Sequence, residues 1–299
     1  MPTKKKKAKA SRRAPKKAKA SRPKDNQAAR PMPLAAPMKD PPDLPHRAGL
    51  PAKDSIISIT EPLPRTGMAG VAAAPRYRII HTNEVDEYER AAASPKSFAA
   101  AAAAAPTGDN YQGTARKAAK LSLATAPTEN FNDVKDLIAT LPAEVKMTKH
   151  TPKITTAATS NRVQEEKRNV HVKGFIYAAS KEADNDFHLI IGRDPSATPE
   201  MYMTMELSGL PPSKFPAFPQ LKAARDAFKK FFNDNLGGQL PGVGYDFPDP
   251  PIPVEIDGSL FFDMTHATSG GSRPGPKSLK SRMPVIWEVH PISKMVFQS

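Results

Sequence analysis

The chain has 299 residues, of which 33 are proline and 7% are aromatic, and its formal net charge is +14. A chain with so much proline and so few large apolar side chains cannot offset the entropy of ordering its whole length, so we expect about half of it to fold. The absence of cysteine excludes disulfides, zinc–thiolate sites, iron–sulfur clusters and thiol catalysis.

No apolar run approaches the roughly 20 residues that a membrane-spanning helix needs. The basic N-terminal residues are not followed by the apolar segment of a secretory signal. The twin arginine at Arg12 and Arg13 precedes Ala-Pro-Lys-Lys, unlike an export signal. We therefore expect an intracellular, cytoplasmic protein with no membrane partner, nucleoid-associated if bacterial and nuclear if eukaryotic.

The first predicted element is a basic arm, residues 1–24, which holds twelve lysines and arginines and no acidic residue. By contrast, residues 169–299 hold thirteen basic and fourteen acidic residues, a balance of −1. The arm has no hydrophobic face and repels itself, so we expect it to stay disordered until it meets nucleic acid or another polyanion. A solubilising leader is the alternative interpretation. The arm residues predicted to contact nucleic acid are Lys4, Lys5, Lys6, Lys7, Arg12, Arg13, Lys16 and Lys17.

Residues 25–165 read as a low-complexity linker rich in proline and alanine. Three islands within it look more ordered, at about 76–93, 113–126 and 128–146. In the last island Asn132 or Thr128 is expected to cap a short helix that Pro142 stops; its apolar face holds Phe131, Val134, Leu137 and Ile138. The islands either dock on the folded body or on a partner, or form only transient helices.

From residue 168 onward the pattern changes to strands. Apolar and polar side chains alternate along "NVHVKGFIYAA" and "MYMTMEL", and the apolar run "FHLIIG" lies between them. Because side chains two apart share one face of a strand, these stretches predict a meander of three strands.

A helix and two more strands follow. In "FPQLKAARDAFKKFFNDNLGG" the apolar residues recur at helical spacing, Pro219 suits the start, and Gly237 with Gly238 suits the stop. The fourth strand is "VEIDGSLFFDM", where Gly258 predicts a bulge or sharp bend, and the last is "PVIWEVHPISKMVF".

This order of three strands, a helix and two strands over about residues 168–297 resembles the OB-fold. The resemblance implies a mainly β protein, with a five-stranded OB-like barrel at its C-terminal end preceded by a long, largely disordered region. The stretches "DNDFHLIIG", "GSLFFDMTH" and "WEVHPI" also resemble a domain of bacterial proteins with no assigned function, which implies no activity. They draw attention to Asp186, His188, Asp263, His266, Glu288 and His290.

Histidines and carboxylates at the strand ends are candidates for a catalytic or metal site. Imidazole nitrogen and carboxylate oxygen are the ligands that suit zinc, manganese or iron, with a water as the reactive group. No compact motif such as HExxH occurs. The catalytic candidates are His188, Asp263, His266, Glu288 and His290.

The strand register argues against a single site. Glu288 and His290 share one face of the last strand, but antiparallel pairing places Asp263 and His266 near the start of that strand and His290 nearer its other end. We therefore expect smaller clusters. We favour a structural role, in which Glu288 and His290 bond to backbone and Asp263 caps the loop by an Asx turn.

The loop "THATSGGSRPGPKSLKSRM" carries four cations and no acid, and in OB-folds this loop commonly contacts oligonucleotides. Phe175, Tyr177 and Tyr202 are candidates for base stacking, although packing beneath the helix is the commoner fate of such side chains. The first loop opposes this function, because its Glu182, Asp184 and Asp186 would repel phosphates, and these acids would suit a hard cation. The four loop cations predicted to contact nucleic acid are Arg273, Lys277, Lys280 and Arg282.

These patterns predict a non-enzymatic protein without a cofactor that binds nucleic acid through the basic arm, with the OB-like body as a groove or a protein-binding face. One alternative is a hydrolase of phosphoesters that uses the histidines, the carboxylates and a divalent metal. The other is a scaffold whose islands and barrel bind only proteins.

Overall fold

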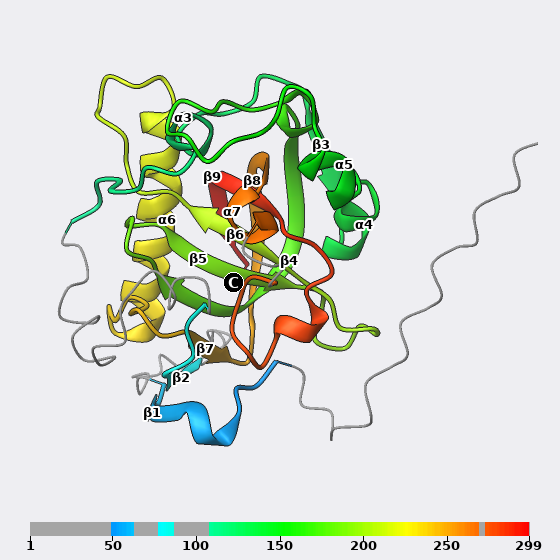
Figure 1. Cartoon of the computed structure of the whole chain (residues 1–299). Coiled ribbons are helices and arrows are strands. Elements are labelled where there is room, and N and C mark those ends of the chain that lie inside the picture. Colours follow the sequence, from blue (N-terminus) through cyan, green and yellow to red (C-terminus); the bar gives the residue numbers. More distant parts are fainter. Residues whose placement is uncertain (1–48, 63–76, 87–107, 269–272, 299) are drawn as a thin grey trace, which may run out of the picture. The chain divides into compact units, whose positions relative to one another are not determined.

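Strands dominate the C-terminal half of the chain and close into a barrel (Figure 1). The computed structural model describes residues 49–62, 77–86, 108–268 and 273–298. Five strands pair in the order β4, β5, β6, β9 and β8, and β8 also pairs with β4, which closes the ring. All these pairs are antiparallel except β6 with β9. The barrel strands are β4 (Asn169–Lys181), β5 (Phe187–Gly192), β6 (Tyr202–Leu207), β8 (Ile252–Phe262) and β9 (Trp287–Phe297).

The predicted five-stranded barrel with a helix between its third and fourth strands is confirmed. Helix α6 (Phe218–Leu236) follows β6 and precedes β8. Pro219 lies in its first turn, and Gly237, in the left-handed conformation at φ 69°, ends it, as predicted. The apolar stripe of α6 packs into the core of the barrel, where the ring centroids of Phe228 and Phe187 are 5.0 Å apart.

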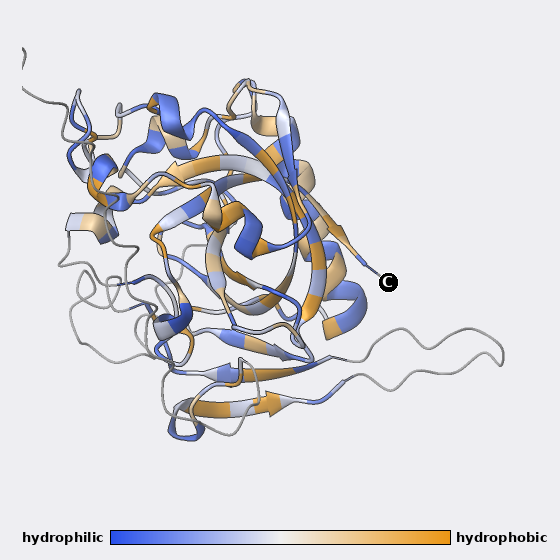
Figure 2. Ribbon diagram, turned by 90° about the vertical axis from the view of Figure 1, so that its right-hand side faces the viewer, coloured by the Kyte–Doolittle hydropathy of each residue, from blue (hydrophilic) through white to orange (hydrophobic). Residues whose placement is uncertain are grey.

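The barrel core is made by the alternating side chains that the sequence predicted (Figure 2). Leu189 on β5, Met205 on β6 and Val289 on β9 are fully buried in it together with side chains of β4, β8 and α6. The residues between them point to the outer face of β5, β6 and β9. That outer face carries the polar residues discussed below.

Gly258 lies at the predicted irregularity of β8, where the register against β9 shifts on both sides of it. A Cβ atom at this position would lie 2.5 Å from Cγ1 of Val289 and 2.7 Å from the carbonyl oxygen of Pro291. Glycine is therefore required because the backbone of β9 approaches too closely for a side chain.

Three short strands extend the sheet beyond the barrel, in the order β1, β2, β7 and then β4 (Figure 1). β2 lies inside the 76–93 island, of which residues 87–93 are outside the described part. The strands β1 and β7 were not predicted, because each is short and β7, with the sequence DFPD, contains a proline at an interior position. Their bounds are β1 (Ile56–Thr60), β2 (Arg78–Thr82) and β7 (Asp246–Asp249).

Residues 108–166 pack on the barrel. The folded body therefore begins well before residue 165, where the predicted linker ends. Strand β3 (Thr128–Phe131) runs parallel to β4, and helix α4 (Val134–Ala139) buries Val134 and Leu137 in the barrel core. For the 113–126 and 128–146 islands, docking on the body is thus the correct alternative. The predicted caps were wrong: Asp133 caps α4 by accepting a hydrogen bond from the N–H of Lys135. The other elements here are α3 (Lys117–Lys120), α5 (Glu144–Thr148) and the 3-10 turn η2 (Gln164–Glu166).

The described elements belong to one compact unit, Arg47–Ser299. It also contains the short helix α7 (Met264–Thr268) and two 3-10 turns, η1 (Lys53–Ser55) and η3 (Lys280–Arg282). The basic arm and its eight predicted contact residues lie outside the described residues. Within the described ranges, no helix combines the length and the apolarity needed to cross a bilayer.

Candidate functional site

Histidines and carboxylates gather on the outer face of β5, β6 and β9. His188 on β5 lies directly across the strand pair from Glu206 on β6, and Thr204 lies across from Glu288 on β9. His290, two residues after Glu288, lies on the same face of β9. The parallel pairing of β6 with β9 therefore brings together polar residues that are far apart in the sequence.

His290 lies at the centre of this group. Its Nδ1 is 2.7 Å from Oε2 of Glu206 and 3.5 Å from Oε2 of Glu288, and its Nε2 is 3.4 Å from Oδ2 of Asp186. The His290 side chain is completely buried, as is that of Asp186. Asp186 lies in the loop between β4 and β5. Its Oδ1 accepts a hydrogen bond from the N–H of Gly209, which helps to fix the conformation of this loop.

Residues 108–166, which pack on the barrel, are called the docked segment below. Lys120 in this segment brings a positive charge to the same carboxylates. Its Nζ lies 3.4 Å from Asp184, 3.5 Å from Asp186 and 3.7 Å from Glu206. Burial disfavours its charge, but the three carboxylates outweigh burial and raise the pKa of Lys120 well above its ordinary value. Lys120 therefore stays protonated beside the cluster.

His188 forms a second part of the cluster. Its Nδ1 donates a hydrogen bond of 2.5 Å to Glu182 and lies 3.8 Å from Oε1 of Glu206, while its Nε2 is 3.3 Å from Oγ1 of Thr204. Burial lowers the pKa of His188, and burial likewise lowers the pKa of His290. Both imidazoles are therefore neutral near pH 7, which is the form that accepts a proton or binds a metal.

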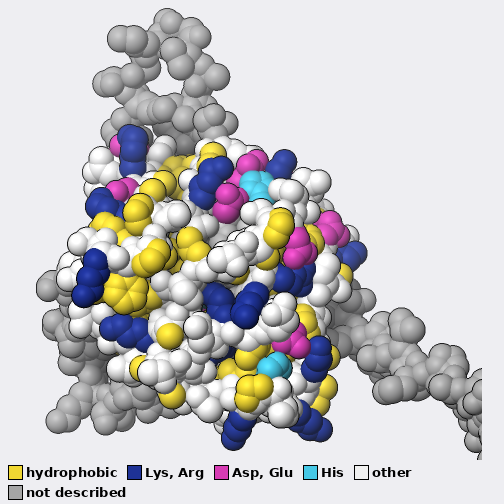
Figure 3. All heavy atoms as spheres, turned by 90° about the horizontal axis from the view of Figure 1, so that it is seen from above, with side chains coloured by type: hydrophobic (Ala, Val, Ile, Leu, Met, Phe, Trp, Pro, Cys, Tyr) yellow, Lys and Arg dark blue, Asp and Glu magenta, His cyan; other side chains and the backbone are white. Residues whose placement is uncertain are grey.

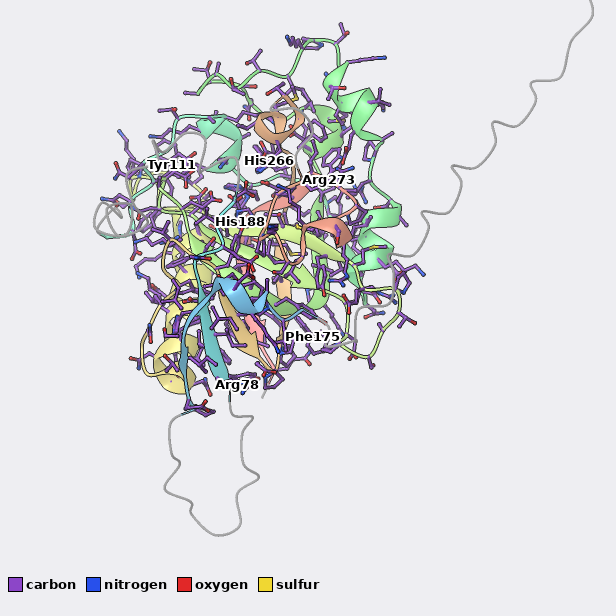
Figure 4. The ribbon with its side chains drawn as sticks, turned by 60° about the horizontal axis from the view of Figure 1, so that its bottom comes forward. Arg78, Tyr111, Phe175, His188, His266 and Arg273 are labelled. Carbon is purple, nitrogen blue, oxygen red and sulfur yellow. The ribbon has the colours of Figure 1, made fainter. Side chains whose placement is uncertain are left out.

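A third part contains His266 on α7 between two carboxylates. Its Nδ1 donates to Asp263 and its Nε2 donates to Asp86 over 3.3 Å. Burial opposes charge on the ring, but these two hydrogen bonds outweigh burial and raise the pKa of His266 to about 11. Asp86 is held in place by the N–H of Gly275, which donates to its Oδ2. Figure 4 shows His266 close to His188 in the middle of the molecule, with Tyr111 to one side.

The six candidates named by the sequence lie in three small sets, as expected, but these sets adjoin one another. Glu288 joins the parts, since its oxygens reach His290 on one side and group with Asp263 and His266 on the other. Three sets of side chains bring their nitrogen and oxygen ligand atoms within 4.8 Å of one another. These sets are Glu182, His188 and Glu206; Asp186, Glu206 and His290; and Asp263, His266 and Glu288.

Several buried atoms of this cluster have no hydrogen-bond partner among the described residues. They include Oδ2 of Asp186 and Nε2 of His290, whereas Nδ1 of His290 and Oε2 of Glu206 lie 2.7 Å apart and contact each other. The hydroxyl of Tyr111, beside the same carboxylates, also lacks a partner. Buried polar atoms are almost always satisfied in proteins, so such a concentration is typical of a place where water, an ion or a ligand binds.

Charge in the cluster is strongly unbalanced. Burial, together with neighbouring carboxylates, raises the pKa of Asp186 and of Glu288 well above the ordinary range. Burial acts in the same direction on Glu206, but His290 and Lys120 outweigh it and hold its pKa well below the ordinary value. The seven carboxylates of the cluster are Asp86, Glu182, Asp184, Asp186, Glu206, Asp263 and Glu288.

The face that an OB-fold commonly offers to oligonucleotides is covered here by the chain itself. Tyr177 and Tyr202 are 2% and 1% exposed and pack edge to face in a second core, so they are not available for stacking, and they do not lie beneath α6. Phe175 is half-buried against the same core.

The predicted cations of the last loop are partly engaged. Arg273 forms an ion pair with Glu144, and Arg282 forms one of 2.9 Å with Glu200. Lys280 has interactions within the body as well, whereas Lys277 is exposed. Figure 3 shows lysines and arginines on the face seen from above, and they are dispersed among acidic and apolar side chains.

Sequence reasoning missed Lys120 and Asp86 as members of the cluster, and it did not include Glu206 among the catalytic candidates. Glu206 had a detectable signal, because it follows His188 by one hairpin and shares its face of the sheet. Lys120 and Asp86 had none, since both reach the cluster from segments assigned to the linker. The likeness to a bacterial domain with no assigned function stays a prediction, as does membership of any OB-fold family. Compared with known proteins, the chain matches no family model, no curated protein and no solved structure.

Proposed function

We propose that this protein is a metal-dependent hydrolase whose divalent cation is bound by Asp186, Glu206 and His290. The observation that carries the proposal is that these three side chains are buried and bring ligand atoms within 4.8 Å of one another, while Oδ2 of Asp186 and Nε2 of His290 have no hydrogen-bond partner among the described residues. A cation between them would satisfy all three at once.

The ligand chemistry supports a borderline transition metal. Neutral imidazole nitrogen combined with carboxylate oxygen suits zinc, manganese or iron, and in a tetrahedral site with bonds of about 2.1 Å two ligand atoms lie about 3.4 Å apart. Nε2 of His290 and Oδ2 of Asp186 are separated by 3.4 Å.

Electrostatics favour the same conclusion. The cluster contains seven carboxyl groups, whereas Lys120 and His266 are its only protonated cations among the described residues, so it has a deficit of positive charge. A divalent cation would reduce this deficit. It would also lower the raised pKa of Asp186 and of Glu288, because a nearby cation favours the charged form of a carboxyl group.

Hydrolysis is the reaction class that these residues fit. A bound divalent metal makes its water acidic and polarises the bond to be cleaved. His188, neutral and held by Glu182 next to Glu206, is placed to accept a proton. The side chains of Lys120, Asp184 and Glu182 are 14%, 18% and 12% exposed, so solvent reaches the cluster from their side. Lys120 is placed to attract a phosphate group, which makes phosphoesters the proposed substrates.

Metal binding is the first prediction. Protein purified without an affinity tag is expected to contain about one equivalent of a divalent transition metal, measured by inductively coupled plasma mass spectrometry. Because loss of an outer-shell partner alone costs about 10–100-fold in metal affinity, His290→Ala and Glu206→Gln should each weaken binding more than about 100-fold in calorimetric titration of the EDTA-treated protein. The matched control is His171→Ala, which removes a histidine that bonds to Asp257 on the barrel wall.

The outcome that would contradict the proposal is equally direct. Wild-type protein that binds neither zinc nor manganese at millimolar concentration, or His290→Ala protein that binds them as tightly as wild type, would remove the metal centre. Metal binding without metal-dependent hydrolysis of bis(p-nitrophenyl) phosphate would remove the hydrolase and leave a metal-binding protein.

A second function rests on the sequence of the basic arm. Twelve cations without one acidic residue in residues 1–24, beside a body whose residues 169–299 are nearly neutral, support binding to nucleic acid. The paired loop cations Arg273 and Arg282 contribute less to this proposal than the arm does.

Salt dependence tests the arm. If about six of its cations contact phosphates, raising the salt from 50 to 200 mM should lower the affinity for DNA or RNA by about 10³-fold. A variant that lacks residues 1–24 should bind weakly at both salt concentrations in fluorescence anisotropy. Equal affinity and equal salt slopes for the two proteins would show that the arm does not bind.

A further inference from the structure

Three side chains on the strands outside the barrel form a hydrogen-bonded line. Oγ1 of Thr60 on β1 is 2.8 Å from Nε2 of His81 on β2, and Nδ1 of His81 is 2.8 Å from Oδ1 of Asp246 on β7. The strand register explains the alignment. His81 and Asp246 are directly opposite each other, and Thr60 is the diagonal neighbour of His81 on the same face.

We propose that Thr60, His81 and Asp246 form a second catalytic site, which hydrolyses small uncharged carboxylic esters through an acyl-enzyme on Thr60. The three residues have the order of roles that nucleophilic catalysis requires: a hydroxyl, a base within hydrogen-bond reach, and a carboxylate that orients the base. The inference does not depend on the metal centre, because none of its residues belongs to the histidine–carboxylate cluster.

Solvent exposure of the side chains increases from Asp246 through His81 to Thr60, as nucleophilic catalysis requires. The side chain of Asp246 is 9% exposed and that of His81 13%, whereas Thr60 is exposed to solvent. The carboxylate is thus shielded while the hydroxyl can meet a substrate. The hydrogen bond to Asp246 raises the pKa of His81 against the effect of its burial, which favours transfer of the Thr60 proton to the ring.

A cavity of about 220 Å³ lies beside Thr60. Ligand pockets for drug-sized molecules hold roughly 300–1,000 Å³, so this cavity accommodates only a small acyl group. Ile79 and Leu236 give it apolar walls, and the carboxylate of Glu61 disfavours an anionic substrate. Figure 4 places Arg78, the neighbour of Ile79, well below His188 and His266, so the cavity is separate from the metal centre.

Tyr77 supplies a second, independent sign of a ligand. It lines the same cavity, is 2% exposed, and its hydroxyl has no hydrogen-bond partner among the described residues. Burial raises the pKa of Tyr77, so the hydroxyl keeps its proton. A buried phenol donor in the same cavity as the nucleophile is suited to stabilise the oxyanion that forms when an ester carbonyl is attacked.

The reaction balances with water as the only co-reactant. Oγ1 of Thr60 bonds to the ester carbonyl carbon while its proton passes to Nε2 of His81. The bond from that carbon to the alcohol oxygen then breaks, and the departing alkoxide takes the proton from His81. Water attacks the acyl-Thr60 ester with His81 again accepting a proton, and return of this proton to Thr60 releases the carboxylic acid.

Hydrolysis of p-nitrophenyl acetate tests the site. The assay is run on the full chain in EDTA, so that failure of the metal centre does not affect it. Thr60→Val, which keeps the shape of the side chain, and His81→Ala should each lower kcat/KM by about 100-fold or more, since general acid–base catalysis contributes roughly 10²–10⁴-fold. Thr60→Ser should keep the activity. Ser58→Ala removes a neighbouring hydroxyl on the same strand and should have no effect.

Detection of the acyl-enzyme by mass spectrometry distinguishes loss of the nucleophile from loss of activity through misfolding. Intact-mass and peptide analysis of protein quenched within seconds of mixing should show one acetyl group on Thr60 in the wild type and none on that peptide in Thr60→Val. Equal kcat/KM for wild type and a folded Thr60→Val variant, or acetylation at lysines with none at Thr60, would overturn the proposal. A wild type with no activity above the buffer rate would overturn it as well.

Discussion

Replacing Arg116 with methionine is expected to lower the free energy of unfolding by about 3–5 kcal/mol. Glu166 is completely buried, and its two carboxylate oxygens accept hydrogen bonds of 2.6 and 2.8 Å from the Arg116 guanidinium. The same oxygens accept from the N–H groups of Phe262 and Val163. Without the guanidinium, the buried carboxylate would lose its hydrogen-bonded ion pair and keep only the more distant charge of Arg162, which costs far more than the loss of an exposed ion pair.

The double variant Arg116→Met/Glu166→Leu separates the effect of an unpaired buried charge on the free energy of unfolding from the effect of altered packing. Replacement of a buried ion pair by apolar groups is often neutral, so the double variant should recover most of the stability that Arg116→Met loses. Lys222→Ala, which breaks an exposed pair with Asp226 on α6, should change the unfolding free energy by less than about 1 kcal/mol. Urea denaturation measures all four proteins, and a loss below about 1 kcal/mol for Arg116→Met would contradict the argument.

This pair matters because it attaches the docked segment to the barrel. The Arg116 guanidinium also donates to the carbonyl oxygen of Phe262 on β8. Arg162 acts in the same way, since it donates to the carbonyl oxygens of Leu260 and His290 as well as to those of Ala119 and Ser122. The docked segment therefore helps to hold the backbone of β8 and β9 beside the cluster. Its loss would expose the face of the sheet on which His290 lies.

The barrel was predictable because its residues obey local rules. Alternation along β6 assigns Met203, Met205 and Leu207 to the core, and the apolar stripe of α6 shows a helical period with proline before it and glycine after it. Gly258 marks the bulge. Each of these signals lies within about ten neighbouring residues, so the sequence alone carries it.

The extra strands and the docked segment were not predictable in this way. Their buried apolar residues, such as Val134 and Leu137, are few and widely spaced in the sequence. They are also stabilised by single buried polar groups, such as Arg116 and Arg162, whose partners lie 40 or more residues away. An isolated arginine in a proline- and alanine-rich stretch looks like a solvated charge. Only the three-dimensional structure reveals that its partner is a buried carboxylate.

The candidate residues of the cluster were recognised, but their convergence was not. The argument from β8 and β9 alone was right in placing Asp263 near the start of β9. It also correctly predicted small sets, but it did not show that these sets adjoin, because Glu288 lies between Asp263 and His290 and β6 adds Glu206 between His188 and His290. The pairing of strands distant in sequence cannot be derived from the period of each strand.

Raising the pH above neutrality is expected to destabilise the metal-free protein through His266. The pKa of this histidine is raised from an ordinary value of 6.5 to about 11 by hydrogen bonds to Asp263 and Asp86, which outweigh its burial. A raised pKa means that the folded state holds a proton that the unfolded state releases. The stabilisation is complete below pH 6.5 and is lost as the pH rises toward 11. At 1.36 kcal/mol per pH unit, the upper limit of this loss is about 6 kcal/mol.

Comparison with His266→Gln isolates this contribution from the other titrating groups around it, which include Glu288, His188 and Lys120. In urea denaturation at pH 6 to 10 in EDTA, the unfolding free energy of the wild type should fall with pH more steeply than that of His266→Gln, by up to about 1.4 kcal/mol per unit. His150→Gln, at a histidine that bonds to Pro152 and Glu165, should give a curve parallel to the wild type. Parallel curves for wild type and His266→Gln would mean that the ring is not charged between its two carboxylates, and the charge deficit that favours a divalent cation would then be one unit larger.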